Sequence, residues 1–205
     1  MKLTLAVTTL VLLFAGVAYG GDSLPPPTWP ASDIKPIGTD IQPATGVTLD
    51  SFHVTFEKTT FHDVLGALGA APVQHQGDAG EFLMWVCYTL PDVHARVWLT
   101  SSELGGHKYI DGMVAKQLES TDTKTSLCPV ATRQIAVVSL DHGIWLGSSV
   151  EKIKNILGIA NGAPASVISY TYQGKDGEFD VDSFLALKMR KNQVTELYAS
   201  HTTTN

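Results

Sequence analysis

Two stretches of the chain show the same order of hydrophobic and polar positions. In each stretch, apolar residues first recur with the spacing of one helical face. The apolar positions are Phe61, Val64, Leu65 and Leu68 in the first stretch, and Val150, Ile153, Ile156 and Leu157 in the second. We therefore predict two short helices of about three turns each.

The ends of these predicted helices carry recognisable signals. Ser148, with Glu151 three residues later, is typical of a capped helix start, and Gly158 is a favourable C-terminal stop. In the first stretch Thr59 would begin the helix, with His62 in the place of the glutamate. We expect that cap to be weaker.

Apolar runs rich in aromatic and β-branched residues follow each predicted helix and favour strands. They span residues 82–88, 95–99 and 108–110 in the first stretch and 167–172, 184–189 and 194–198 in the second. The segment 109–118 also fits a helical face. We favour a strand there, because Gly112 would weaken a helix and the matching segment of the second stretch is strand-like.

These patterns predict an α+β fold of two tandem repeats. Each repeat is a short helix followed by a three-stranded antiparallel meander, with the helices packed on one sheet face. The first repeat covers residues 46–120, a linker with Cys128 covers 121–132, and the second repeat covers 133–205. Whether the repeats form one domain or two stays open.

Residues 1–20 have the composition of a secretory signal peptide. Lys2 is the only charged residue before Asp22, and an apolar run ending in small residues follows it. We predict export to the periplasm or the extracellular space. Residues 21–45 form a proline-rich leader, which is expected to be extended and semi-rigid. No later segment is long and apolar enough for a membrane span in the mature chain.

The charge and the cysteine content narrow the function classes. The chain has 14 Lys and Arg against 20 Asp and Glu, with no basic cluster, which argues against nucleic-acid binding. Its two cysteines, Cys87 and Cys128, predict a disulfide in an exported protein. They lack the close spacing of zinc ligands, so we expect neither a metal site nor a cofactor.

Residues 144–158 carry a motif with the order I-x-x-G-S-x-x-x-x-I-x-x-x-LG. This motif resembles the start of small exported domains, namely outer-membrane assembly lipoproteins of the SmpA/OmlA type and the tandem β-lactamase-inhibitor-protein family. The two-repeat order is similar to the latter. The resemblance implies protein–protein binding through the open sheet face and its loops.

Aromatic residues of the predicted strands are the candidate binding residues, because Trp and Tyr on an exposed sheet face commonly anchor protein interfaces. The candidates are Trp85, Tyr88, Trp98, Tyr170, Tyr172 and Tyr198. By alternation, Tyr170 and Tyr172 lie on the same face of their strand. Met84, Val86 and Tyr88 likewise lie on one face of theirs. The sequence does not decide which face is exposed.

The histidines suggest a weaker, catalytic alternative. His53 and His62 lie near several aspartates, but no metal-binding or hydrolase spacing is present. Asp141 and His142 precede Ser148 without the G-x-S-x-G motif of a nucleophile elbow. A His-dependent hydrolase is therefore the least favoured interpretation, and we predict that the protein is not an enzyme.

The leading hypothesis is an exported, soluble protein-binding module of the inhibitor, immunity or envelope-assembly type. The alternative is a binder of a small molecule, lipid or cell-wall glycan in the groove between the repeats. A deep apolar pocket would favour the small ligand, and a broad aromatic face would favour the protein partner.

Overall fold

The computed structural model describes residues 23–28, 35–77, 82–120, 122, 125–158 and 166–205. The predicted signal peptide and Trp29 of the leader lie outside the described residues. No helix within these ranges is long and apolar enough to cross a membrane.

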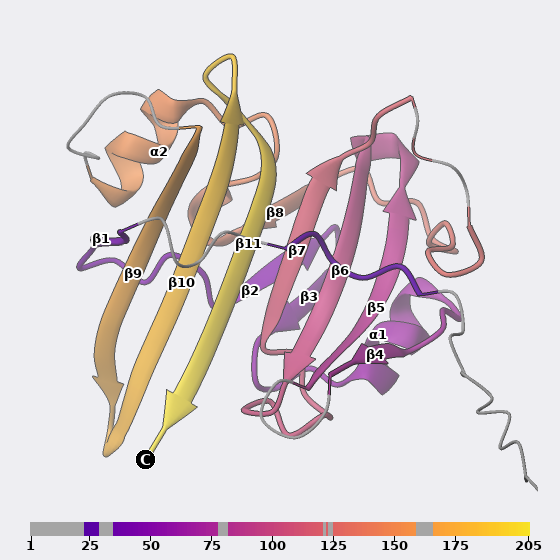
Figure 1. The fold of residues 1–205 in the computed structure, drawn as a ribbon, viewed down its shortest axis with the longest axis horizontal. Helices are drawn as coiled ribbons and strands as arrows, with labels where there is room; N and C mark the ends of the chain where they lie inside the picture. The colour runs from indigo at the N-terminus through magenta and orange to yellow at the C-terminus, as the bar shows by residue number, and fades with distance from the viewer. Residues whose placement is uncertain (1–22, 29–34, 78–81, 121, 123–124, 159–165) are drawn as a thin grey trace, which may run out of the picture.

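An eight-stranded mixed sheet dominates the molecule, with strand order β1-β9-β10-β11-β7-β6-β5-β4 (Figure 1). All neighbours are antiparallel except β1 and β9, which are parallel. Its strands are β1 (Ile37–Gly38), β4 (Gln74–Gln76), β5 (Leu83–Leu90), β6 (Ala95–Ser102), β7 (Gly112–Gln117), β9 (Val167–Asp176), β10 (Phe179–Arg190) and β11 (Gln193–Thr204). The pairing of β7 with β11 therefore joins the early and late parts of the chain.

A smaller sheet and two α-helices complete the fold. The small sheet has the order β3-β2-β8. Its strands are β2 (Gly46–Leu49), β3 (Phe52–Thr55) and β8 (Val138–Leu140), the helices are α1 (Phe61–Leu68) and α2 (Val150–Leu157), and the 3₁₀ turns are η1 (Pro91–Val93) and η2 (Asp141–Gly143). Because β8 pairs with β2, this sheet also combines distant parts of the sequence.

The predicted fold class is wrong. The chain is mostly β, with an eight-stranded mixed sheet and a separate three-stranded sheet, and does not form two repeats of a helix with a three-stranded meander. The prediction missed β1, β2, β3 and β4, which have two to four residues each. Segments this short are stabilised by tertiary pairing, so hydrophobic alternation hardly marks them. The predicted domain boundaries stay a prediction.

The two helices begin one residue later than the sequence suggested. Thr60 caps α1: its hydroxyl accepts from the Asp63 amide at 3.2 Å, and the Asp63 carboxylate accepts from the Thr60 amide at 2.9 Å. Ser149, and not Ser148, caps α2 by accepting from the Lys152 amide at 3.1 Å. The expected stop at Gly158 is confirmed, since its backbone has a φ of 98°.

The inner face of the large sheet is covered by both helices and by the small sheet. One continuous core joins apolar residues of α1 and α2 with inward residues of the large sheet. Val64 and Ile153 of the helices, and Leu99 and Leu197 of the sheet, are almost fully buried in it. In Figure 1 the helices and the small sheet lie behind the large sheet.

The opposite side, here called the outer face, carries three rows of facing residues that run from β5 to β9. The register places the rows two residues apart along each strand, about 7 Å. The charged row is Thr89, Arg96, Lys116, Glu196, Lys188 and Val167; the tyrosine row is Cys87, Trp98, Val114, Tyr198, Ala186 and Ser169; and the glycine row is Trp85, Thr100, Gly112, Ser200, Phe184 and Thr171. The candidate site is built on this face.

Candidate functional site

The six predicted aromatic residues do not form one exposed surface. Trp85, Tyr88, Trp98 and Tyr170 are at most 2% exposed, while Tyr172 and Tyr198 are half-buried. They also divide between the faces: Tyr88 and Tyr170 belong to the inner core, and Trp85, Trp98 and Tyr198 belong to the outer cluster. The prediction of which residues share a sheet face is correct. Both faces of the sheet, however, carry buried aromatic rings.

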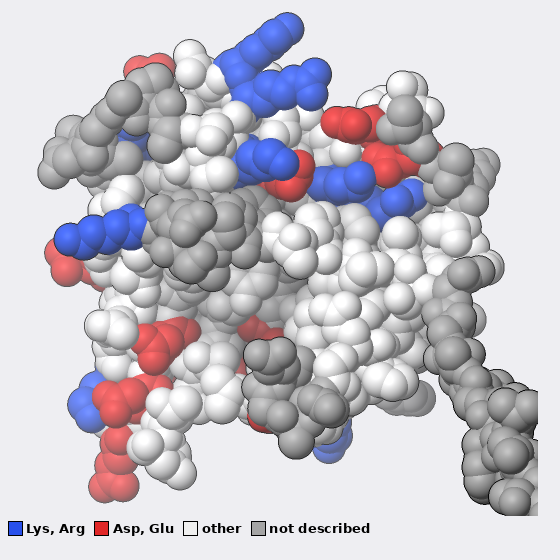
Figure 2. Space-filling view, viewed as in Figure 1, with Lys and Arg blue, Asp and Glu red and all other residues white. Residues whose placement is uncertain are grey.

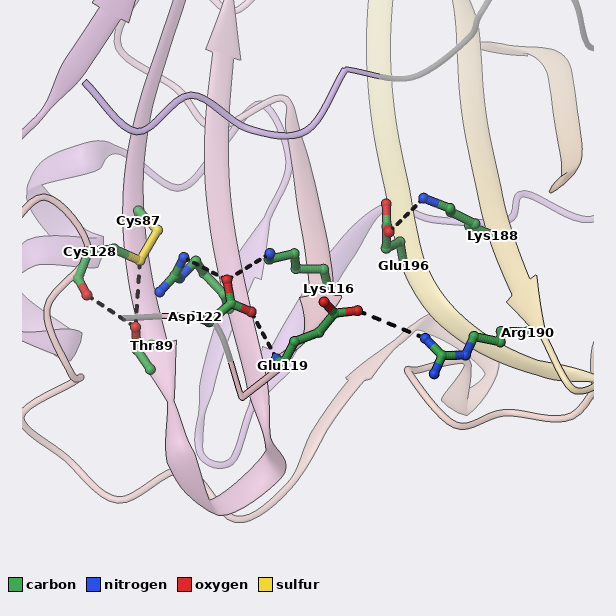
Figure 3. Close-up of polar contacts among 10 residues, drawn as sticks. Cys87, Thr89, Lys116, Glu119, Asp122, Cys128, Lys188, Arg190 and Glu196 are labelled. Carbon is green, nitrogen blue, oxygen red and sulfur yellow. Dashed lines mark hydrogen bonds and ion pairs between the residues drawn. A yellow bond between two sulfur atoms is a disulfide. The ribbon is translucent and has the colours of Figure 1, made fainter. Parts of the chain in front are cut away.

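The disulfide between Cys87 and Cys128 is confirmed, with Cα atoms 4.6 Å apart. It holds the segment after β7 against β5 (Figure 3). The hydroxyl of Thr89 donates to the carbonyl oxygen of Cys128 at 3.1 Å. Together with Trp85 and Trp98, the disulfide forms a second, smaller core on the outer face.

Residues 23–28, here called the strap, cross the outer face in front of β5, β6 and β7 (Figure 1). The indole nitrogen of Trp98 donates to the carbonyl oxygen of Leu24 at 3.1 Å. The side chain of Gln74 accepts from the Leu24 amide at 2.7 Å. The Leu24 side chain packs on the outer cluster. The leader is thus fixed to the sheet by its main chain.

A cavity of about 520 Å³, here called the strap cavity, lies between the strap and the sheet. The strap contributes Pro26, Pro27 and Thr28 to its wall. The rest of the lining comes from β4 to β7, β9 to β11 and the loop after β6: Gln76, Leu83, Thr100, Ser102, Leu104, Asp111, Val114, Ser169, Phe184, Ala186, Tyr198, Ser200 and Thr202. No lysine or arginine is among these residues.

Two small residues, Gly112 and Ala186, lie on the outer face, and Ala186 lines the strap cavity. Gly112 has no side chain at the centre of the glycine row, and a Cβ there would lie 2.9 Å from the Ala199 carbonyl oxygen and 3.0 Å from the Thr100 hydroxyl. Ala186 stands between Tyr198 and Ser169 in the tyrosine row. Larger side chains at either position would occupy this part of the outer face.

Ser169 gives the floor an unusual polar group. The residue is 2% exposed. Within the described ranges, its hydroxyl oxygen has no hydrogen-bond partner. A buried hydroxyl without a partner costs about 1–3 kcal/mol of desolvation, and such groups call for an explanation.

Asp111 is the one carboxylate in the cavity lining, and it is only 4% exposed. Its carboxylate accepts from the Ser102 amide at 2.8 Å and from the Ser102 hydroxyl. Burial raises the pKa of Asp111, while the hydrogen bonds from Ser102 act against that shift. Burial also raises the pKa of Tyr198, and the charge of Asp111 adds to this effect.

A polar cleft of about 870 Å³ adjoins the charged row, between the end of β7 and the β10–β11 hairpin. Its basic residues are largely paired: Lys188 lies 2.8 Å from Glu196, Lys116 lies 2.9 Å from Asp122, and Arg190 lies 3.9 Å from Glu119 (Figure 3). Hydrogen bonds from the Glu119 amide and Lys116 lower the pKa of Asp122, although burial, the largest single influence, raises it. The cleft is therefore a network of compensated charges.

The histidine-based alternative finds little geometric support. His53 makes a 3.0 Å hydrogen bond with the Thr48 hydroxyl. Asp141 accepts from the Thr45 amide and hydroxyl at 2.5 and 2.6 Å. The Ser148 hydroxyl accepts from the Trp145 amide. Among the residues described, no group of three His, Cys, Asp or Glu side chains could hold a metal ion.

Sequence reasoning missed Asp111, Ser169 and Phe184 of the cavity, and the role of Pro26 and Pro27. The proline run did indicate an extended leader. Comparison of the chain with protein-family models, with curated proteins and with solved structures found no match. The resemblance drawn from residues 144–158 therefore stays a prediction, and the functional argument rests on the geometry of the strap cavity.

Proposed function

We propose that this protein binds a small, largely apolar molecule in the strap cavity. The observation that carries the proposal is the mainly apolar hollow between the strap and the sheet, whose lining includes the unpartnered Ser169. A volume of about 520 Å³ lies within the range of about 300–1,000 Å³ that is common for ligand pockets. Apolar walls with a few placed polar groups are the usual composition of such pockets.

This proposal takes up the small-molecule alternative of the sequence analysis. The protein-partner hypothesis relied on exposed aromatic residues of the sheet, and four of the six are buried. The strap also covers part of the outer face, where a partner was expected to dock. The apolar hollow beside the strap is the feature that favours a ligand.

A neutral, environment-sensitive dye tests the proposal directly. N-phenyl-1-naphthylamine should bind the disulfide-intact protein saturably, at one molecule per chain, with a rise in fluorescence. Ala186→Phe should abolish this binding, because a ring at position 186 fills the cavity floor. Gln173→Phe is the matched control: it adds a ring at an exposed position of neighbouring β9, outside the cavity lining.

Two outcomes would contradict the proposal. The first is the absence of saturable dye binding to the wild-type protein. The second is equal dye binding by Ala186→Phe and by the wild type, with both folded as judged by circular dichroism. Native mass spectrometry of protein purified from the producing cells would then be the way to search for a different ligand.

A further inference from the structure

The charged and aromatic groups of the strap cavity indicate what kind of molecule fits it. We propose that the ligand carries a positive charge, which pairs with the carboxylate of Asp111 and lies against the rings of Phe184 and Tyr198. This inference rests on the proposed function, since it assumes that the strap cavity is the ligand site. The ligand class is thus an organic cation with an apolar body.

The first argument is the charge of the lining. Asp111 is the one carboxylate there, and no basic side chain lines the cavity. An anionic head group would be buried without a counter-charge and beside a carboxylate, and both effects oppose binding. A cation removes the unfavourable burial of the Asp111 charge. Ser102 supplies two hydrogen bonds to that carboxylate, and these neutral donors do not cancel its charge.

The second argument is the pair of rings. Phe184 and Tyr198 have centroids 5.8 Å apart and planes tilted by 58°. Both side chains line the cavity, as Asp111 does. Cations favour the faces of aromatic rings, and proteins use this attraction to bind quaternary ammonium groups. Rings and a carboxylate in one cavity form a recognisable site for an alkylated ammonium group.

The third argument is the charge around the cavity. Thr202 of the lining stands directly opposite Asp182 of β10. Asp182 lies near the β9–β10 turn, where residues 175–182 also include Asp176, Glu178 and Asp180 against the single basic residue Lys175. Figure 2 shows these acidic residues gathered on the lower left of the face. A negative surface raises the local concentration of cations.

The basic residues of the charged row do not create a preference for an anionic ligand. Lys188 and Lys116 lie one row away from the tyrosine row, but each is held within 3 Å of a carboxylate, at 2.8 and 2.9 Å. Arg190 and Lys191 lie farther along the β10–β11 hairpin, next to the polar cleft. An anionic head group would have to leave the strap cavity to reach them.

A matched series of octyl compounds tests the charge preference. Octyltrimethylammonium, octanol and octanoate share one apolar chain, and each would be titrated, below its micelle concentration, against protein carrying bound N-phenyl-1-naphthylamine. We expect the cation to displace the dye at a concentration at least about ten-fold lower than octanol, and octanoate to be the weakest. Equal displacement by the cation and octanol would overturn the inference and leave the proposed function standing. Absence of dye binding and of displacement by all three would overturn both.

Asp111→Asn should reduce the preference for the cation over octanol by about ten-fold, because the amide keeps the size of the side chain and removes its charge. Asp92→Asn is the control, since it removes an exposed charge of η1, outside both the cavity lining and the acidic β9–β10 turn. A preference unchanged in Asp111→Asn would contradict the inference. If that variant does not fold, proton NMR of the wild type decides: nuclear Overhauser effects must join the trimethylammonium protons to the rings of Phe184 and Tyr198. Contacts from the octyl chain alone would overturn the assignment.

Discussion

The indole nitrogen of Trp98 donates a hydrogen bond to the carbonyl oxygen of Leu24 at 3.1 Å, across 74 positions of sequence. This contact fixes the strap to β6, next to the strap cavity. Trp85 offers a natural comparison. It lies on the neighbouring strand, is equally buried, and its indole nitrogen has no hydrogen-bond partner in the described part of the chain.

Trp98→Phe should therefore lower the free energy of unfolding by about 1 kcal/mol more than Trp85→Phe does. Both substitutions remove the same part of an indole ring from one cluster, but only the first removes a hydrogen bond. Urea unfolding measures the difference. Amide exchange of Leu24 should also become faster in Trp98→Phe alone. Equal losses and unchanged exchange would show that the bond contributes little to holding the strap.

Reducing the disulfide should destabilise the folded protein by about 4 kcal/mol in the chain-entropy model. The bond between Cys87 and Cys128 closes a loop with a sequence separation of 41, so its loss enlarges the freedom of the unfolded chain. The measurement compares urea unfolding of the oxidised protein with that of Cys87→Ala/Cys128→Ala. A difference below about 1 kcal/mol would mean that the outer cluster holds this segment without the bond.

Substitution of alanine for glycine should lower the stability of the protein at one position and raise it at another. At Gly112 the new methyl group would lie 2.9 Å from the Ala199 carbonyl oxygen, and such overpacking costs about 1–3 kcal/mol. At Gly66, an exposed position of α1, a Cβ meets nothing within 4 Å. Gly66→Ala should stabilise the protein by about 0.5–1 kcal/mol through helix propensity. Thermal unfolding of the two variants measures both effects, and a Gly112→Ala variant at least as stable as the wild type would contradict the close approach described at Gly112.

Asp111 should give the protein a distinctive dependence of stability on pH. Burial raises the pKa of its carboxyl above the ordinary value of 3.8. Because the folded state holds this proton more tightly, the stabilising contribution is complete below the ordinary value and is lost as pH rises through the raised pKa. The side chain in Asp111→Asn does not titrate, so the variant should gain stability relative to wild type as pH rises from the ordinary value of 3.8 through the raised pKa.

The measurement is urea unfolding of wild type and Asp111→Asn at a series of pH values. The two proteins differ only at this side chain, and one further group coupled to it is Tyr198, whose pKa the Asp111 charge raises. His201 is bound to Asp111 through its backbone amide, at 2.9 Å. A difference that does not change with pH would contradict the raised pKa.

Local features of this fold could be predicted where one segment determines them. The spacing of Ile153 and Leu157 predicted α2, and alternation correctly placed Tyr170 and Tyr172 on one face of β9. The caps were displaced by one residue, because Thr59–Thr60 and Ser148–Ser149 each offer two adjacent hydroxyls. The backbone, which the sequence does not show, decides which hydroxyl reaches the third amide of the helix.

The candidate site could not be predicted, because it depends on pairings between distant segments. Ser169 and Val114 enter one row only through the registers of β9, β10, β11 and β7. The strap is held by Gln74 and Trp98, which are 50 and 74 positions away from Leu24. Neither relationship leaves a local periodicity, so the proline-rich leader was visible in the sequence but its binding position was not.

The position of β11 has a consequence for how the protein can be made. This strand is the last of the large sheet in sequence, yet it lies near the middle, between β10 and β7. During synthesis β7 has been made long before its partner and exposes an unpaired edge until β11 arrives. The two halves of the sheet can therefore close only after β11 has been made, and a chain interrupted before β11 is left with open edges that favour aggregation.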